Sequence, residues 1–344
     1  MRHFFHNFIP REDIMRSMLT GAPWLLAHKS MLAVNQPQKV TLYGKDYVLW
    51  KDTNAAVHAL LNNCPHMGAM LSAGWCAGKS NGTSAVVCPF HALAFDAEGC
   101  TVLPGSGKKT QPLLEPLELV VQGDLIWSYG GHEPKVPIPT LLNDIAVEYD
   151  FIGVTGDRSV PTNLLSMLLN MHDYNHQNGT HRSLFEITEV QFKQFIDEGH
   201  QSHAYYDMPR TEPKLADVLG NPALLALPKV LTAHLENIFP SLVVFHGESP
   251  LATLKQCHLF IPEAENRTRT YVLMFMQAHN AIAHLLKPNF LKLADVVVKQ
   301  DADILGKIYP ETPQKIKLNN EVGMDWVRRN FTSFPEVVAP NLSK

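Results

Sequence analysis

Two short stretches of this chain, Cys64-Pro65-His66-Met67-Gly68 and Cys88-Pro89-Phe90-His91, each combine one thiol with one imidazole. A cluster of two irons and two sulfides needs four protein ligands, and in one class two cysteines hold one iron while two histidines hold the other. Structural zinc also accepts two cysteines and two histidines, but usually with Cys-x2–4-Cys and His-x3–5-His spacing. The Cys-x-His spacing of the first stretch is too tight for that pattern. The sequence therefore predicts a [2Fe-2S] cluster with four protein ligands: Cys64, His66, Cys88 and His91.

The composition is that of an ordinary globular protein with room for about two domains. Of the 344 residues, 45% are hydrophobic and 18% are charged, and the formal net charge is −4. This balance predicts binding neither to nucleic acid nor to an anionic membrane. No apolar run reaches the roughly 18 residues of a transmembrane helix. The first residues also lack the apolar core and cleavage site of a secretory signal, so we expect a cytoplasmic protein.

The hydrophobic pattern changes character along the chain. From about residue 40 to 131, short runs separated by turns predict a small all-β domain that carries both cysteine loops. Pro134, Pro137 and Pro139 mark a linker. Beyond the linker, longer periodic segments predict a mixture of helices (162–175, 214–237 and 288–308) and strands (241–246, 252–260 and 268–277).

These patterns predict an α+β protein. We expect an N-terminal segment over residues 1–38 that packs on the larger domain, and the all-β domain over residues 39–132. Residues 133–344 are expected to form a larger mixed domain in which helices flank an antiparallel sheet.

A second cluster of metal-binding residue types lies between Asn170 and His181. His176 and His181 are separated by Asn178-Gly179, a pair suited to ending a helix, so both imidazoles can converge on one ion. Asp173 lies three residues before His176 on the same helical face, where it can orient that imidazole. His172 with His176 is an alternative metal pair, and a capped surface turn is the non-functional interpretation.

Two imidazoles and one carboxylate form the facial triad of non-haem Fe(II) oxygenases. The best source of a carboxylate is the late helical segment around Asp301 and Asp303, because an acidic residue facing a core needs a partner. At about 100° per residue these two side chains point roughly 200° apart, so only one faces inward. Asp295 is a third candidate. The sequence does not assign any residue of a substrate pocket.

With both motifs in view, the chain resembles the Rieske non-haem iron oxygenases, the terminal components of multi-part hydroxylating systems. The two cysteine loops are similar to the family's cluster loops. Asn170, Asp173, His176 and His181 look like its N-x2-D-x2-H-x4-H iron motif, and Gln300-Asp301 is similar to its late carboxylate motif. The resemblance covers nearly the whole chain, and the two motifs occur in the family's order.

The chain departs from the family pattern at three places. Met67 stands where an arginine is common, and Ala92-Leu93 replaces the usual Gly-Trp after the second cluster histidine. The stretch between His66 and Cys88 is also longer than usual. None of these changes removes a ligand, but each alters the surroundings of the cluster and hence its potential or its contact surface.

The resemblance implies a mechanism and a set of partners. An external reductase or ferredoxin would pass electrons to the Rieske [2Fe-2S] cluster in residues 39–132. The electrons would continue to an Fe(II) held by His176, His181 and Asp301 in the catalytic domain, which activates O2 beside a small organic substrate. In the family the cluster serves the iron of a neighbouring subunit in a homotrimeric ring. Asp173 would then act catalytically as the bridge from His91 of one chain to His176 of the next.

The resemblance leaves the reaction open between several outcomes. The chain is short beside the large subunits of ring-dihydroxylating dioxygenases, which favours monohydroxylation or oxidative demethylation. Ring dihydroxylation is the alternative within the same class. A non-catalytic Rieske electron carrier or an iron-binding sensor is the alternative of another class, although a carrier would not need the second iron motif.

Overall fold

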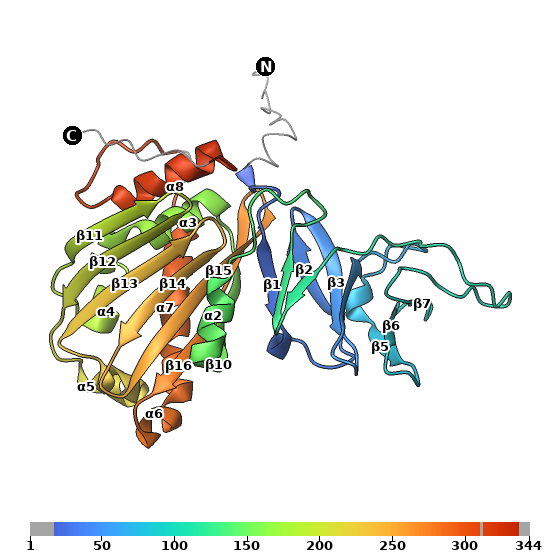
Figure 1. Ribbon diagram of the computed structural model, residues 1–344, viewed down its shortest axis with the longest axis horizontal. Coiled ribbons are helices and arrows are strands. Elements are labelled where there is room, and N and C mark those ends of the chain that lie inside the picture. The colour runs from blue at the N-terminus through green and yellow to red at the C-terminus, as the bar shows by residue number, and fades with distance from the viewer. Residues whose placement is uncertain (1–16, 310–311, 337–344) are drawn as a thin grey trace, which may run out of the picture.

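The computed structural model describes residues 17–309 and 312–336, which form a smaller and a larger β-rich part side by side (Figure 1). The smaller part holds three antiparallel sheets of three strands each. Their orders and bounds are β1 (Trp24–His28), β9 (Leu125–Ser128), β8 (Val120–Gln122); β2 (Gln38–Leu42), β3 (Lys45–Lys51), β4 (Val57–Leu61); and β5 (Trp75–Gly78), β6 (Ser84–Val87), β7 (Ala94–Phe95). Two 3-10 turns, Lys29–Met31 and Leu71–Ala73, complete it. The predicted all-β character of this region is confirmed.

The larger part is built on one antiparallel sheet of seven strands. In spatial order these are β10 (Asp150–Val160), β16 (Arg267–Ala278), β15 (Ala252–Ala264), β14 (Leu242–Glu248), β13 (Val230–Ile238), β12 (Gln201–Pro209) and β11 (Gln191–Glu198). From β11 to β16 each strand pairs with the next one along the chain, as in a meander, and β10 closes the far edge against β16.

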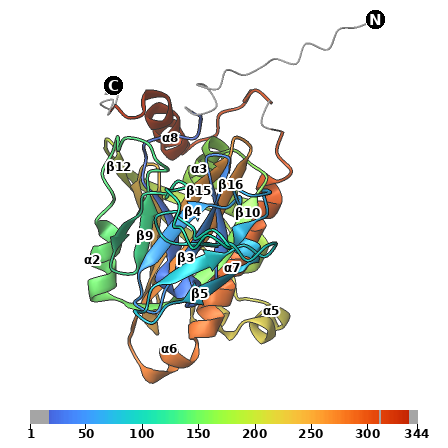
Figure 2. The same ribbon diagram turned by 90° about the vertical axis from the view of Figure 1, so that its right-hand side faces the viewer.

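Helices flank this sheet, as Figures 1 and 2 show. They are α2 (Leu141–Glu148), α3 (Leu164–His172), α4 (Arg182–Phe185), α5 (Leu215–Gly220), α6 (Ala281–Leu285), α7 (Lys287–Leu305) and α8 (Val322–Ser333), with 3-10 turns η3 (Tyr174–Asn178) and η4 (Pro222–Ala226). The α+β fold class predicted from sequence is confirmed. No helix in the described ranges has the length and apolar character needed to cross a bilayer.

One predicted helix is wrong over half its length. The segment 214–237 is helical only as far as Ala226, and from Val230 it forms strand β13 between β12 and β14. Its burial alternates along the strand, with Ala233 and Leu235 buried. Burial with a period of two residues is typical of a strand. As a strand, this segment forms hydrogen bonds with β12 and β14 on both sides. An isolated helix that follows Pro228 would lack these hydrogen bonds.

The first described strand connects the two parts. β1 pairs with β9 of the smaller part, while the Leu25 carbonyl accepts a 2.6 Å hydrogen bond from the Tyr271 hydroxyl of β16. The His28 ring stacks on Phe151 of β10 with ring centroids 4.1 Å apart. Residues 1–16 of the predicted N-terminal segment lie outside the described residues. The domain boundaries themselves stay a prediction.

Candidate cluster loops and metal centre

The two cysteine loops adopt the same backbone turn. In the first, the Cys64 amide donates to the Ala69 carbonyl at 2.9 Å and the Gly68 amide donates back to the Cys64 carbonyl at 2.8 Å. In the second, Cys88 and Leu93 form the equivalent pair at 2.9 Å, and Ala92 donates to Cys88 at 3.1 Å. The residue that closes each turn has a positive φ, +76° at Gly68 and +54° at Ala92. The matching turns bring the two cysteine–histidine pairs to one place.

The four predicted cluster ligands differ in burial. Cys64 and Cys88 are buried, whereas His66 and His91 are exposed at the surface. The two imidazoles face each other with their Nδ1 atoms 3.2 Å apart. Burial raises the pKa of the Cys64 thiol, and the neighbouring Cys88 thiol raises it further. Two adjacent thiols inside and two adjacent imidazoles outside fit a [2Fe-2S] cluster with one iron on each pair.

The second predicted site gathers three side chains from three segments. His176 lies in η3, His181 immediately precedes α4, and Asp301 lies on α7. Asp301 Oδ1 is 3.6 Å from His176 Nε2 and 3.2 Å from His181 Nε2. Among the described residues this is the one group of three or more His, Cys, Asp or Glu residues whose ligand atoms all lie within 4.8 Å of one another. Residues far apart in sequence therefore converge as a facial triad requires.

Neighbouring oxygens fix which imidazole nitrogen faces the centre of this triad. His176 Nδ1 bonds to the Asp173 backbone carbonyl, and His181 Nδ1 is 2.8 Å from Gln300 Oε1. A carbonyl oxygen only accepts hydrogen bonds, so each Nδ1 carries the proton and each Nε2 presents a lone pair to the centre. Outer-shell contacts of this kind orient imidazole ligands in metal sites.

The charge balance of the triad also fits a bound cation. Burial works to raise the pKa of Asp301, but the two histidines outweigh it and hold the pKa below its usual value, so the carboxylate is ionised. Burial lowers the pKa of His176. Burial also acts to lower the pKa of His181, but Asp301 outweighs it and the net shift is upward. Asp301 Oδ1 is buried without a hydrogen-bond partner, and an anionic oxygen in that state needs a positive partner.

The alternative ligands considered from sequence lie elsewhere. Asp303 is exposed and pairs with Lys299 one turn earlier on the same helix. Asp295 pairs with Arg158 of β10. His172 is buried with its ring 5.3 Å from that of Trp326, and its Nδ1 is 2.7 Å from the Leu168 carbonyl. The structure thus separates Asp301 from both other carboxylates and His176 from His172.

The His176 ring bonds to the backbone carbonyl of Asp173 and not to its carboxylate. The Asp173 carbonyl oxygen accepts from His176 Nδ1, while Asp173 Oδ1 accepts from the Asn175 amide at 3.0 Å and so caps η3. Burial raises the pKa of Asp173. Within one chain the carboxylate therefore has a capping role.

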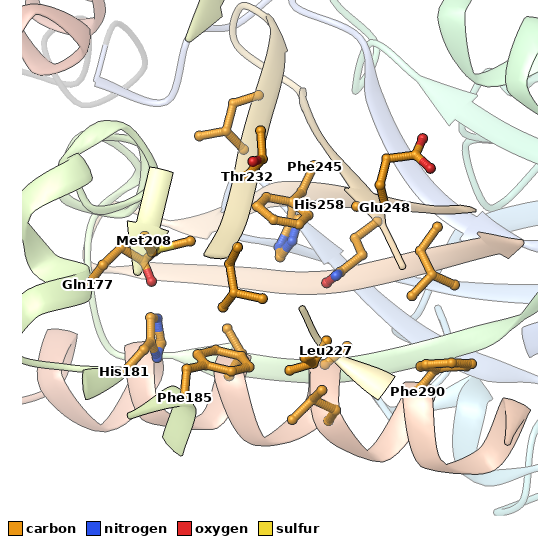
Figure 3. A pocket seen from close by; sticks show the side chains of 18 of the residues that line it. Gln177, His181, Phe185, Met208, Leu227, Thr232, Phe245, Glu248, His258 and Phe290 are labelled. Atoms are coloured by element: carbon orange, nitrogen blue, oxygen red, sulfur yellow. The ribbon is translucent and has the colours of Figure 1, made fainter. Parts of the chain in front are cut away.

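A large cavity opens directly onto the triad, between the sheet and helix α7 (Figure 3). It encloses about 1160 Å³ of space, part of it open to solvent. Its walls are mostly apolar, and polar groups are few. Gln256 and His258, both on β15, are functional candidates that sequence reasoning missed. The available signal was two polar residues at i and i+2 within a strand that is otherwise largely buried.

Comparison with known proteins identifies the family. Residues 23–113 match the model of the Rieske [2Fe-2S] domain, a span that contains both cysteine loops. A 4beta-methylsterol monooxygenase of Methylococcus capsulatus is 23% identical over 298 residues, 83% of this chain and 76% of that protein. The oxygenase component of dicamba O-demethylase of Stenotrophomonas maltophilia is 29% identical over 46% of this chain and 47% of its own length. The chain therefore carries a Rieske [2Fe-2S] domain and is homologous to the oxygenase components of Rieske oxygenases.

The fold of this Rieske oxygenase agrees with solved relatives. The crystal structure of dicamba monooxygenase bound to 3,6-dichlorosalicylic acid superposes with a TM-score of 0.71 and 19% identity, covering 91% of this chain and 96% of that one. A further structure of the same monooxygenase holds non-haem iron and dicamba. The cofactors expected from sequence, a [2Fe-2S] cluster and a mononuclear iron, are those of this family.

Proposed function

We propose that this Rieske oxygenase is a cytoplasmic terminal component that hydroxylates or oxidatively demethylates a small organic substrate, with electrons from an external reductase or ferredoxin. The observation that carries this proposal is the opening of the His176–His181–Asp301 triad directly onto a large apolar cavity. A metal in the triad would lie beside whatever the cavity binds. An electron carrier has no use for such a cavity, and this disfavours the carrier alternative.

Each site residue has a defined part in this proposal. Cys64, His66, Cys88 and His91 would hold the cluster, and the triad would hold Fe(II). When bound, the cluster supplies single electrons and the iron supplies oxygen-activating chemistry. The protein keeps both Nε2 atoms aimed at the metal through the Asp173 carbonyl and Gln300. The apolar cavity walls exclude water from the reacting part of the substrate.

The relatives favour monooxygenation or demethylation over dihydroxylation. A methylsterol monooxygenase and a dicamba O-demethylase are among the proteins to which this chain is similar. The phthalate 4,5-dioxygenase oxygenase subunit of Pseudomonas putida is also similar, at 24% identity over 45% of this chain. Dihydroxylation is therefore the second candidate.

We also propose that the working unit is a homotrimeric ring. In Figure 1 the strands β5–β7, which frame the second cysteine loop, lie at the opposite end of the molecule from α4 beside the triad. The exposed His66 and His91 are accompanied by exposed apolar side chains, with Met67 65% and Phe90 58% exposed. An apolar rim around two ligand imidazoles is suited to docking on a neighbouring copy. Asp173 would meet His91 across that interface.

The proposal is tested with the purified, iron-loaded protein and a surrogate reductase. Oxygen uptake and product formation are followed while candidate substrates are screened. We expect substrate-stimulated oxygen uptake and about three irons per chain, two in the cluster and one in the triad. About two irons without oxygen uptake would identify an electron carrier. Three irons without substrate-stimulated turnover would identify a sensor.

A further inference from the structure

The cavity beside the triad has no cationic side chain in its described lining. Its charged groups are both acidic, Asp301 at the metal site and Glu248 at the other end, well away from His181 in Figure 3. In the body of the cavity, away from the triad where a bound Fe(II) would offset Asp301, an anionic ligand would lose its hydration without meeting a cationic side chain, which is costly. The lining therefore disfavours carboxylate or phosphate ligands in the body of the cavity.

Most polar groups of the lining are already bonded within the protein. Ser249 Oγ donates to the Ala252 carbonyl at 2.9 Å, and Glu248 Oε2 accepts from the Thr253 hydroxyl at 2.9 Å. These groups are therefore not available as independent recognition points.

Among the polar residues of the described lining, Gln256, His258 and Tyr206 make no side-chain hydrogen bond within the protein, and the first two lie close together on β15. Gln256 and His258 occupy alternate positions of β15, so both project from the same face of the sheet into the cavity, as Figure 3 shows for His258. Within the described part of the chain, neither side chain has a hydrogen-bond partner, and His258 is only 7% exposed. Burial lowers the pKa of His258 to about 4, so its imidazole is neutral and offers one donor and one acceptor. The polar atoms of Gln256 and His258 face the open cavity instead of a protein partner, so a ligand that fills the cavity can bond to them.

We propose that the cavity selects an uncharged, largely apolar molecule that carries one hydrogen-bonding oxygen, which His258 and Gln256 bind. The rest of the molecule would lie along the apolar walls and bring a C–H bond to the triad. Binding of such a molecule does not depend on the proposed oxygenase function. Only the consequence of binding, oxidation of the molecule at the triad, rests on that function. His258 and Gln256 are positioning residues in this scheme.

Binding of three matched probes tests the proposal without turnover. Equilibrium dialysis of the iron-loaded protein at pH 7.5, without reductant, measures the Kd of 2-acetylnaphthalene, 2-naphthoate and 2-ethylnaphthalene. The three differ in offering a neutral oxygen, an anionic carboxylate or no polar group on one skeleton. We expect the ketone to bind about tenfold more tightly than either of the others, the value of one well-placed hydrogen bond. Equal or tighter binding of 2-naphthoate, or no measurable binding of the ketone, would overturn the assignment.

Variants locate the recognition point. His258→Leu and Gln256→Leu are each expected to raise the Kd of the ketone about tenfold and leave that of 2-ethylnaphthalene within about twofold. His258→Gln, which keeps a donor and an acceptor, should restore part of the preference. His284→Leu, the same substitution at an exposed position of α6, is the matched control and should change neither Kd.

The variants also separate this inference from the proposed function. Circular dichroism and iron content show whether a variant is folded and loaded. An unchanged ketone-to-hydrocarbon ratio in both leucine variants would refute the role of Gln256 and His258, even if the protein consumed oxygen. Conversely, a protein with the expected binding preference and no oxygen uptake would refute only the oxygenase proposal.

Discussion

Gly68 and Ala92 occupy the same place in the two cluster loops, but only the glycine suits the backbone conformation found there. Both close their turn with a positive φ, +76° and +54°. Glycine adopts that region freely, while an L-residue with a Cβ pays about 1–2 kcal/mol. The alanine at position 92, a departure from the family pattern, therefore adds strain to the loop that carries Cys88 and His91.

This strain predicts opposite effects of opposite substitutions. Ala92→Gly should raise the free energy of unfolding by about 0.5–1 kcal/mol, because relief of the left-handed strain exceeds the added chain entropy. Gly68→Ala should lower it by about 1 kcal/mol through strain alone, since a Cβ there has no atom within 4 Å. Thermal unfolding of the cluster-loaded protein measures both. A gain in stability for Gly68→Ala would contradict the assignment.

Asp301 and Asp303 lie two residues apart on α7 and differ in environment. Asp301 is 8% exposed and faces two imidazoles, whereas Asp303 is exposed and pairs with Lys299. Asp301→Asn should reduce bound iron from about three to about two per chain, because it removes the charge that offsets the cation. Elemental analysis measures the loss, and the visible absorption of the cluster should persist.

Asp303→Asn provides the matched control on the same helix. Its exposed ion pair contributes little, so iron content and oxygen uptake should match those of the unmodified protein. If Asp303→Asn lost the third iron and Asp301→Asn kept it, the carboxylate ligand would be Asp303.

At the level of elements, close packing of α7 on β10 sets the position of Asp301. A Cβ built on Gly156 of β10 would lie 3.0–3.2 Å from three atoms of the Val298 side chain, which is one turn before Asp301. The Thr155 hydroxyl also donates to the Leu291 carbonyl of α7 at 2.9 Å. The absence of a side chain at position 156 therefore lets the helix approach the sheet.

Gly156→Ala should displace α7 and weaken the metal site. The substitution adds overpacking, typically about 1–3 kcal/mol, to the strain of a residue at φ +67°. We expect a lower unfolding midpoint together with reduced iron content in the triad. Gly123→Ala is the matched control, because it has φ +59° and open space around its Cβ, so it carries the strain without the clash. Equal losses for the two variants would show that packing against Val298 is unimportant.

On the scale of the whole molecule, the cluster loops and the triad belong to different parts of the chain. The loops lie in the smaller β part, and the triad lies between the large sheet and α7. Asp173 is half-buried beside His176, with one carboxylate oxygen engaged in capping η3. Its proposed second role, contact with His91 of a neighbouring copy, depends on assembly.

Asp173→Asn tests that role more cleanly than alanine. Asparagine also caps helices, so η3 and both metal sites should persist, while the charge that bridges the subunits is lost. We expect normal iron content, an unchanged oligomeric state and turnover reduced about 10- to 100-fold. Steady-state oxygen uptake and size-exclusion chromatography measure these properties. Normal turnover of Asp173→Asn and of Asp173→Ala would refute the bridge.

Features that depend on local spacing could be predicted from the sequence. The two cysteine–histidine loops, the His176–His181 pair and the α+β class follow from residues a few positions apart, because turn geometry and strand period act over that range. The helix period also predicted that Asp301 and Asp303 point in different directions. It did not predict which of the two faces inward.

Contacts between distant segments follow from the three-dimensional fold and not from local sequence patterns. The fold places Asp301, and not Asp303, beside His176 and His181, and it makes residues 230–238 a strand by supplying partners on both sides. It also brings β13, β15 and α7 around one cavity, so that Gln256 and His258 lie as polar groups in a largely apolar wall. Such properties arise from burial and from contacts between residues far apart in sequence, which no local pattern encodes.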